Sequence, residues 1–241
     1  MKRFGLLGHN IAYSLSPKIH SEYYAAHGIN ASYELVDTDN IASVADRLRK
    51  DFDGFNITKP YKQDIVPYLD ELMTDAGAVN TVSRHNGRLI GYNTDGTGFL
   101  GHIRELGVTL RGKDVLVLGA GGVATVIVPV LIQEGATVSI HNRTIESALA
   151  LTDKCGGAVV KDISKERPQI IINCTSVGLG GENCLPAGLS LDRLEFGYDT
   201  IYSPPKTPFL EEAERVGARI TNGYRMLELQ AYEAIRIWTD L

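Results

Sequence analysis

The sequence has 241 residues, of which 44% are hydrophobic and 22% are charged, and its formal net charge is −5. This composition is typical of a globular protein of one or two domains and excludes a disordered chain. Acidic and basic residues are interspersed, so the chain lacks the basic stripe that nucleic-acid binding requires, and we expect no nucleic-acid partner.

The three cysteines, Cys155, Cys174 and Cys184, have no C-x-x-C spacing, which predicts reduced thiols and no metal site. The apolar run after the basic N-terminal tip is too short for a secretory signal, so we expect a cytoplasmic protein. The uncharged run 115–132 is interrupted by glycines and Pro129. It predicts a buried strand, a turn and a helix rather than a membrane span.

Short apolar runs alternate with helix-like stretches along the chain, a pattern typical of parallel sheets covered by helices. In the first half, strands are expected at 2–8, 31–37 and 54–58, with a hairpin around Asn86–Gly87. Helices are expected at 16–26, 41–50 and 65–73. Ser16 and Asn40 are the expected N-caps of the first two helices.

The second half repeats this alternation. After a helix at 99–106, strands are expected at 114–119, 136–142, 158–162, 169–175 and 196–202. The pattern from Met226 to Trp238 predicts a closing amphipathic helix.

A glycine-rich segment follows the strand at 114–119, with a G-x-G-x-x-G/A spacing before a helix-like run. Such glycines allow a tight turn and a close approach of a pyrophosphate to the helix N-terminus. An ordinary strand-to-helix turn can also carry them, but the flanking pattern favours a dinucleotide. The binding residues would be Gly119, Ala120, Gly121, Gly122, Val123 and Ala124.

The next strand ends in Asn142, Arg143 and Thr144, where an NAD enzyme usually carries an acidic residue for the ribose. An arginine matches the charge and planar geometry of a 2′-phosphate, so NADP is the expected cofactor. Thr144 would add a hydroxyl donor and cap the following helix. The alternative is a solvated surface arginine.

Several segments together resemble the shikimate dehydrogenase family. They are GHNIAYSLSPKIH, FNITKPYKQ, GAVNT, GYNTDG, GAGG, NRT, NCTSVGL, YDTIYSPPKTPFL and residues 223–230, and they follow the family's order across nearly the whole chain. The resemblance implies an α/β fold with a substrate-binding domain, a Rossmann-type doubly wound NADP-binding domain and a cleft between them. The substrate-binding and catalytic domain would be 1–97, completed by a C-terminal helix at 226–241, and the NADP-binding domain 98–225.

The resemblance assigns the catalytic pair to Lys62 and Asp95. Hydride delivery to a ketone creates an alkoxide, and a lysine beside a carboxylate can supply the proton. Without the resemblance, Lys62 would be interpreted as a surface lysine and Asp95 as a turn residue.

Polar side chains at other motif positions are expected to bind the substrate. Ser14 and Ser16 suit a carboxylate, although Ser16 can also act as a helix cap. Neutral side chains can read ring hydroxyls or, alternatively, satisfy backbone groups. The full substrate set is Ser14, Ser16, Thr58, Asn80, Asn93, Tyr202 and Gln230, and the nicotinamide would be bordered by Thr175, Ile201, Gly223 and Met226.

The implied activity is the NADPH-dependent reduction of 3-dehydroshikimate to shikimate in aromatic amino acid and chorismate biosynthesis, by a monomer or homodimer without membrane or nucleic-acid partners. Oxidation of quinate or aminoshikimate, and a catalytically silent metabolite-binding protein, are the alternatives. The chain departs from the family pattern at Asn10, Tyr13, Tyr224 and Arg225. We expect these departures to affect the substrate-binding loop and the surroundings of the nicotinamide.

Overall fold

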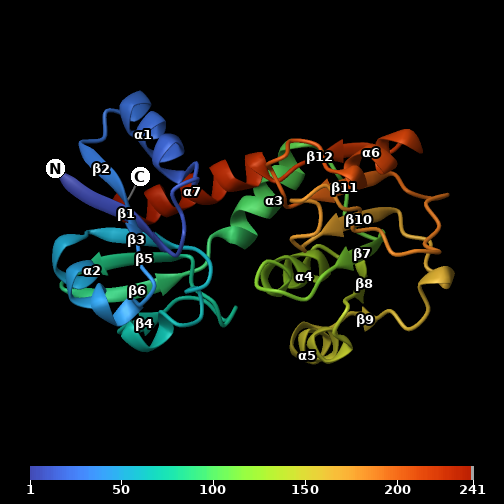
Figure 1. Cartoon of the computed structure of the whole chain (residues 1–241), viewed down its shortest axis with the longest axis horizontal. Coiled ribbons are helices and arrows are strands. Elements are labelled where there is room, and N and C mark those ends of the chain that lie inside the picture. The colour runs from blue at the N-terminus through green and yellow to red at the C-terminus, as the bar shows by residue number, and fades with distance from the viewer. Residues whose placement is uncertain (240–241) are drawn as a thin grey trace. The chain divides into compact units, whose positions relative to one another are not determined.

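The computed structural model describes residues 1–239, which form two compact units (Figure 1). Unit 1 comprises Met1–Gly98 and the described chain from Glu228 onward, and unit 2 comprises Phe99–Leu227. These boundaries lie one and two residues from those expected from the sequence. Positions 240–241 of the expected closing helix lie outside the described residues.

Unit 1 contains a mixed six-stranded sheet in the order β2-β1-β3-β5-β6-β4. Strand β1 pairs in parallel with β2 and β3, whereas β5 and β6 form the expected antiparallel hairpin. The strands are β1 (Lys2–Gly8), β2 (Ala31–Asp37), β3 (Gly54–Ile57), β4 (Glu71–Leu72), β5 (Thr81–His85) and β6 (Arg88–Tyr92). The helices are α1 (Ser16–His27), α2 (Ala45–Asp51) and α7 (Tyr224–Thr239), which begins in unit 2, with short 3-10 turns η1 (Ile41–Ser43) and η2 (Val66–Tyr68).

Alternation along the strands of unit 1 gives the sheet two apolar faces. Leu7 belongs to a buried cluster with residues of α2, whereas Phe4 packs with α1 and α7. The Trp238 ring stacks on Phe4 with 4.4 Å between centroids, and its Nε1 donates to the Val82 carbonyl at 2.9 Å. A Cβ on Gly54 would lie 2.4 Å from that Nε1, so this approach of α7 to the sheet depends on a glycine.

Unit 2 contains a six-stranded sheet in the order β12-β11-β10-β7-β8-β9, in which every pairing is parallel. The strands are β7 (Asp114–Leu118), β8 (Thr137–His141), β9 (Ala158–Val159), β10 (Ile170–Asn173), β11 (Phe196–Asp199) and β12 (Arg219–Thr221). The helices are α3 (Asp95–Glu105), which begins in unit 1, α4 (Ala124–Gln133), α5 (Ile145–Cys155) and α6 (Pro208–Arg215).

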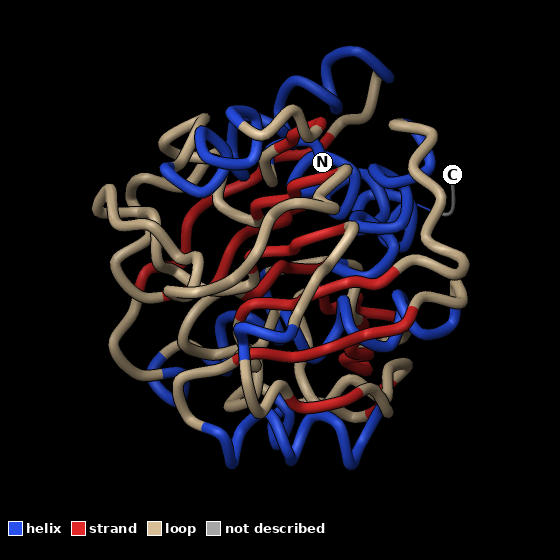
Figure 2. Tube along the Cα trace, turned by 90° about the vertical axis from the view of Figure 1, so that its right-hand side faces the viewer, coloured by secondary structure: helices blue, strands red, loops and turns tan. Residues whose placement is uncertain are grey.

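Figure 2 draws the strands in red and the helices in blue along the chain. In β7 and β10, residues of both faces belong to buried clusters, which explains the continuous apolar sequences of these strands. Val115 and Val117 pack with α4, whereas Leu116 and Leu118 pack with α6. The two-domain α/β fold with a Rossmann-type sheet is therefore confirmed. Among residues 1–239, no helix is long and apolar enough to cross a membrane.

Several local expectations were wrong. The helix expected at 65–73 is instead η2 followed by β4, whose residues pair with β6. Asn40 does act as an N-cap, accepting the Ala42 N–H at 2.9 Å, but it caps η1, and α2 begins only at Ala45. Ser16 is not an N-cap, because Leu15 occupies that position in a helical conformation.

Candidate functional site

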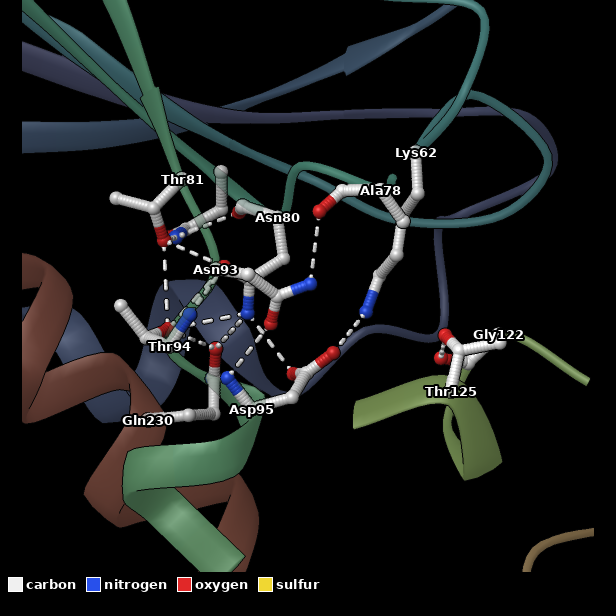
Figure 3. Close-up of polar contacts among 11 residues, drawn as sticks. Lys62, Ala78, Asn80, Thr81, Asn93, Thr94, Asp95, Gly122, Thr125 and Gln230 are labelled. Carbon is white, nitrogen blue, oxygen red and sulfur yellow. Dashed lines mark hydrogen bonds and ion pairs between the residues drawn. The ribbon is translucent and has the colours of Figure 1, made fainter. Parts of the chain in front are cut away.

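The predicted catalytic residues of unit 1 lie in direct contact (Figure 3). Lys62 is in the turn after β3 and Asp95 is the first residue of α3, and Lys62 Nζ donates to Asp95 Oδ2 at 2.5 Å. The two side chains are 23% and 10% exposed. The lysine is therefore shielded but remains accessible to a small molecule.

Asn80 fixes the second oxygen of the same carboxylate. Its side-chain oxygen accepts the backbone N–H of Thr94 at 2.8 Å, and because a backbone N–H can only donate, this bond sets the orientation of the amide. The amide nitrogen consequently donates to Asp95 Oδ1 at 2.8 Å. Asp95 thus accepts one hydrogen bond from Asn80 and one from Lys62.

Two buried threonines complete the surroundings of Asn80, and sequence reasoning missed them. Thr81 Oγ1 donates to Asn80 Oδ1 at 3.0 Å, and Thr94 Oγ1 lies 3.0 Å from Asn80 Nδ2. Gln230 reaches the same cluster from α7, with Oε1 3.3 Å from Asn80 Nδ2. This last contact is long, so a ligand hydroxyl can replace it at little cost.

Asn56 was also missed. It is buried in β3, where Oδ1 accepts the Tyr33 hydroxyl at 2.8 Å and Nδ2 donates to Thr81 Oγ1 at 3.0 Å. A polar residue inside the apolar GFNI strand was the available signal, because buried amides need several partners.

The remaining predicted substrate residues of unit 1 differ in their availability. Ser14 Oγ accepts the Ser16 N–H at 3.2 Å, so Ser14 rather than Ser16 supports the first turn of α1. The half-buried Thr58 hydroxyl forms no hydrogen bond with residues 1–239 and is free to bind a ligand. Asn93 bonds the Ala78 carbonyl and the Asp95 N–H, so in this structure it satisfies backbone groups.

The glycine-rich turn of unit 2 has the geometry expected for a dinucleotide site. Gly119 has a φ of 105°, and a Cβ there would lie 2.8 Å from Thr175 Cγ2. A Cβ at Gly121 or Gly122 would meet no atom within 4 Å, so packing within the chain does not require these glycines. They leave the backbone open to a ligand beside α4, whose N-terminus has no side-chain cap. Ala120, Val123 and Ala124 complete this turn.

Arg143 follows β8 and is exposed. Its side chain forms no ion pair or hydrogen bond with residues 1–239, so it is available to an anionic ligand. Asn142 Nδ2 donates to the Thr144 carbonyl at 2.7 Å and shapes this turn. Thr144 occupies the N-cap position of α5 but forms no side-chain cap, which corrects the expected capping role of its hydroxyl.

Three of the four residues expected to border the nicotinamide belong to one hydrogen-bonded network, in which Asn173 donates to Asp199 at 3.0 Å. Thr175 donates its N–H and hydroxyl to Asn173, Ile201 donates its N–H to Asp199 at 2.9 Å, and Gly223 donates to the Ile201 carbonyl at 3.1 Å. Met226 is buried in the core of unit 2, and Tyr202 is half-buried next to Ile201. Asn173 and Asp199 were missed, although each is a polar residue that ends an apolar strand.

The four departures from the family pattern have defined environments. Asn10 has a φ of 54°, a conformation that asparagine tolerates, and its N–H donates to Asp37. Tyr13 is 79% exposed. Tyr224 and Arg225 begin α7, and Arg225 forms a bidentate pair with Glu105 at 2.8 and 2.7 Å. These hydrogen bonds lower the pKa of Glu105 and engage the guanidinium.

Each of the two units holds groups with defined chemistry. Unit 1 holds a lysine that can donate a proton and a set of neutral hydrogen-bonding groups around it, and unit 2 holds an open glycine turn followed by an available arginine. No group of three or more His, Cys, Asp or Glu within residues 1–239 is arranged to hold a metal ion. The lysine and its neighbours in unit 1 suit proton transfer, and the glycine turn and arginine of unit 2 suit binding of a phosphorylated cofactor.

Residues 6–82 match the shikimate dehydrogenase substrate binding domain, and residues 103–176 match the shikimate / quinate 5-dehydrogenase family. A curated shikimate dehydrogenase (NADP(+)) from Caldicellulosiruptor saccharolyticus is 39% identical, with 100% of this chain and 93% of the relative covered.

Solved structures show the same similarity. The Thermus thermophilus shikimate 5-dehydrogenase in complex with NADP(H) and shikimate is 38% identical, with a TM-score of 0.93 and coverage of 100% of this chain and 94% of that one. The Listeria monocytogenes enzyme in complex with shikimate and NAD is 32% identical, with a TM-score of 0.88 and coverage of 100% and 92%. The chain belongs to the shikimate dehydrogenase family of oxidoreductases.

Proposed function

We propose that this protein is an NADP-dependent shikimate dehydrogenase that reduces 3-dehydroshikimate to shikimate with NADPH, a step of aromatic amino acid and chorismate biosynthesis. The contact of Lys62 with Asp95, with Asn80 on the other carboxylate oxygen, is the observation that carries this proposal. The full-length similarity to curated shikimate dehydrogenases supports it.

Residues of unit 2 would hold the cofactor. The open backbone at Gly121 and Gly122 and the uncapped start of α4 suit the pyrophosphate, and the available Arg143 with the Thr144 hydroxyl suits a 2′-phosphate. Thr175, Ile201, Gly223 and Met226 would border the nicotinamide. When bound, NADPH supplies the hydride.

Residues of unit 1 would bind and orient the substrate. The hydroxyls of Ser14 and Ser16 would take the ring carboxylate, and the free hydroxyl of Thr58 would take a ring hydroxyl. Asn80, Asn93 and Gln230 would supply amide groups, and the Gln230 contact with Asn80 is long enough to yield to a substrate hydroxyl. Tyr202 stays a predicted substrate-binding residue.

Lys62 would donate the proton. Reduction of the ketone leaves negative charge on its oxygen, and a lysine within hydrogen-bonding reach stabilises that charge and transfers a proton to it. Asp95 holds the Lys62 side chain in place, and Asn80 holds Asp95. In the reverse direction the same lysine accepts the proton of the ring hydroxyl.

Quinate is the second candidate substrate, because the family matched by residues 103–176 includes quinate 5-dehydrogenases. The available Arg143 favours NADP, whereas an NAD-linked quinate dehydrogenase would not need a cation at this position.

A steady-state assay tests the proposal. Purified protein is given 3-dehydroshikimate with NADPH or NADH, and shikimate or quinate with the oxidised cofactors, while absorbance at the nicotinamide band is followed. We expect turnover of 3-dehydroshikimate with a preference for NADPH. Turnover of quinate alone, or ligand binding without turnover of any substrate, would contradict it.

A further inference from the structure

Asp199 is a carboxylate with no exposed surface at the end of β11. No Lys or Arg side chain within residues 1–239 forms an ion pair with it, and burial raises its pKa above the ordinary value. Removing a carboxylate from water without a cation is costly unless hydrogen bonds compensate. A residue of this kind therefore calls for an explanation beyond packing.

Three donors surround the Asp199 carboxylate. The Ile201 N–H and Asn173 Nδ2 donate to Oδ1 at 2.9 and 3.0 Å, and the Thr207 hydroxyl donates to Oδ2 at 2.6 Å. Asp199 thus joins the end of β10 to both ends of the segment between β11 and α6.

Asn173, which faces Asp199 in the register of β10 and β11, extends this network. Its Oδ1 accepts the N–H and the hydroxyl of Thr175 at 3.0 and 2.7 Å, and its Nδ2 also donates to the Val177 carbonyl at 3.1 Å. Asn173 has no exposed surface either. The side-chain oxygen of Asn173 therefore binds the loop after β10, and its side-chain nitrogen binds both that loop and Asp199.

The same network reaches the glycine turn. The methyl group of Thr175 leaves no room for a Cβ on Gly119, and the carbonyl of Ile201 accepts the N–H of Gly223. Thr175, Ile201 and Gly223 lie on three different connections of unit 2, and hydrogen bonds through Asp199 and Asn173 join them all.

We propose that Asp199 is a positioning residue for the nicotinamide half of the cofactor site, acting through Asn173 on Thr175 and directly on Ile201. The inference rests on the proposed function, because that function assigns Thr175 and Ile201 to the nicotinamide. It goes further by separating two halves of the site, since the adenosine half depends on the glycine turn and Arg143.

The test compares two ligands in the full-length protein. NADPH spans the whole cofactor site, whereas 2′,5′-ADP lacks the nicotinamide and its ribose. For Asp199→Asn we expect the Kd of NADPH to rise about tenfold, a change that corresponds to about the free energy of one hydrogen bond to a charged group. The Kd of 2′,5′-ADP should change less than about twofold. Calorimetry measures both, and Asp153→Asn on the exposed face of α5 is the control.

Thr207 supplies a gentler pair of variants should Asp199→Asn fail to fold. Thr207→Val removes the hydroxyl that donates to Asp199 and keeps the shape, whereas Thr207→Ser keeps the hydroxyl. We expect Thr207→Val to weaken NADPH binding selectively and Thr207→Ser to restore it. The KM for NADPH should follow the same order, with the KM for the ring substrate unchanged.

The outcomes separate the two proposals. Equal weakening of both ligands, or no weakening of NADPH in folded variants, would overturn the role of Asp199 and leave the proposed function intact. Failure of the wild-type protein to bind both NADPH and 2′,5′-ADP would remove the proposed function and, with it, this role of Asp199.

Discussion

The amide nitrogen of Asn80 lies 2.8 Å from Asp95 Oδ1, the carboxylate oxygen opposite the one that Lys62 contacts. Asn80 is 2% exposed and donates to the carboxylate that holds Lys62, the proposed proton donor. The position of the Lys62 side chain therefore depends on Asn80, which forms no hydrogen bond with Lys62 but holds Asp95.

Replacing Asn80 should therefore lower kcat. In Asn80→Ala, Asp95 loses one donor and the Thr94 N–H loses its acceptor, so we expect kcat to fall about tenfold and the free energy of unfolding to fall by about 1–3 kcal/mol. Steady-state kinetics and urea unfolding measure these effects. Ser83→Ala, on the same strand, is the control, and a kcat equal to that of this control would count against the role of Asn80.

Removing the proton donor should have a larger effect. For Lys62→Ala we expect kcat to fall by about 10² to 10⁴-fold, the usual contribution of general acid catalysis, with NADPH binding retained. Lys59→Ala is the matched control, because the Lys59 side chain is exposed and forms no ion pair with residues 1–239. A loss of less than about tenfold in Lys62→Ala would exclude Lys62 as the main proton donor.

Arg143 should decide the choice of cofactor. For Arg143→Ala we expect the KM for NADPH to rise about tenfold or more through loss of a charge-assisted contact, while the KM for NADH stays the same. Arg215→Ala is the control, since Arg215 is exposed on α6 and pairs with Glu212 of the same helix. Equal changes for the two cofactors would show that Arg143 does not read the 2′-phosphate.

His20 should make stability depend on pH. Its ring is fully buried, Nε2 has no hydrogen-bond partner within residues 1–239, and burial lowers its pKa from 6.5 to about 3. The unfolded chain therefore binds a proton below about pH 6.5 that the native state does not accept until about pH 3, so stability falls as the pH falls through this window.

The expected slope from this histidine is at most about 1.4 kcal/mol per pH unit. In His20→Phe, which keeps an aromatic ring against Tyr33, this component should disappear. Urea unfolding of both proteins between pH 7 and 4 measures it. The raised pKa of Asp199 has the opposite sign and is common to both proteins, so it cancels in the comparison. Parallel pH profiles would contradict the role of His20.

The fold was predictable where local pattern and burial coincide. The apolar strands of unit 2 are covered on both faces, so their sequences are continuously hydrophobic and unambiguous. The helix prediction for 65–73 was wrong because Glu71 and Leu72 are exposed and take a strand conformation through pairing with Ile90 and Gly91. Because β6 lies far from β4 along the chain, the local hydrophobic periodicity of 65–73 does not indicate this pairing.

For the candidate site, the sequence predicted two residues that the structure brings together, but not the hydrogen bonds around them, and their catalytic roles stay a prediction. Ordered motifs identified Lys62 and Asp95, whose side chains do meet. The direction of the Asn80 amide depends on the backbone N–H of Thr94, which only the folded chain places beside it. Asn173 and Asp199 could have been noticed as polar ends of apolar strands, but their mutual contact follows from strand order, which the sequence does not state.

The stacking of Trp238 on Phe4 has an optical consequence. Trp238 is the only tryptophan of the sequence, it is 5% exposed, and its ring lies 5.5 Å from that of His20. Its emission is therefore a reporter of the interior of unit 1 alone, and it is placed to sense the charge of His20. Because the glycine turn and Arg143 belong to unit 2, the fluorescence of bound NADPH would report on the other unit. One sample can thus be read at two wavelengths, each sensitive to a different half of the molecule.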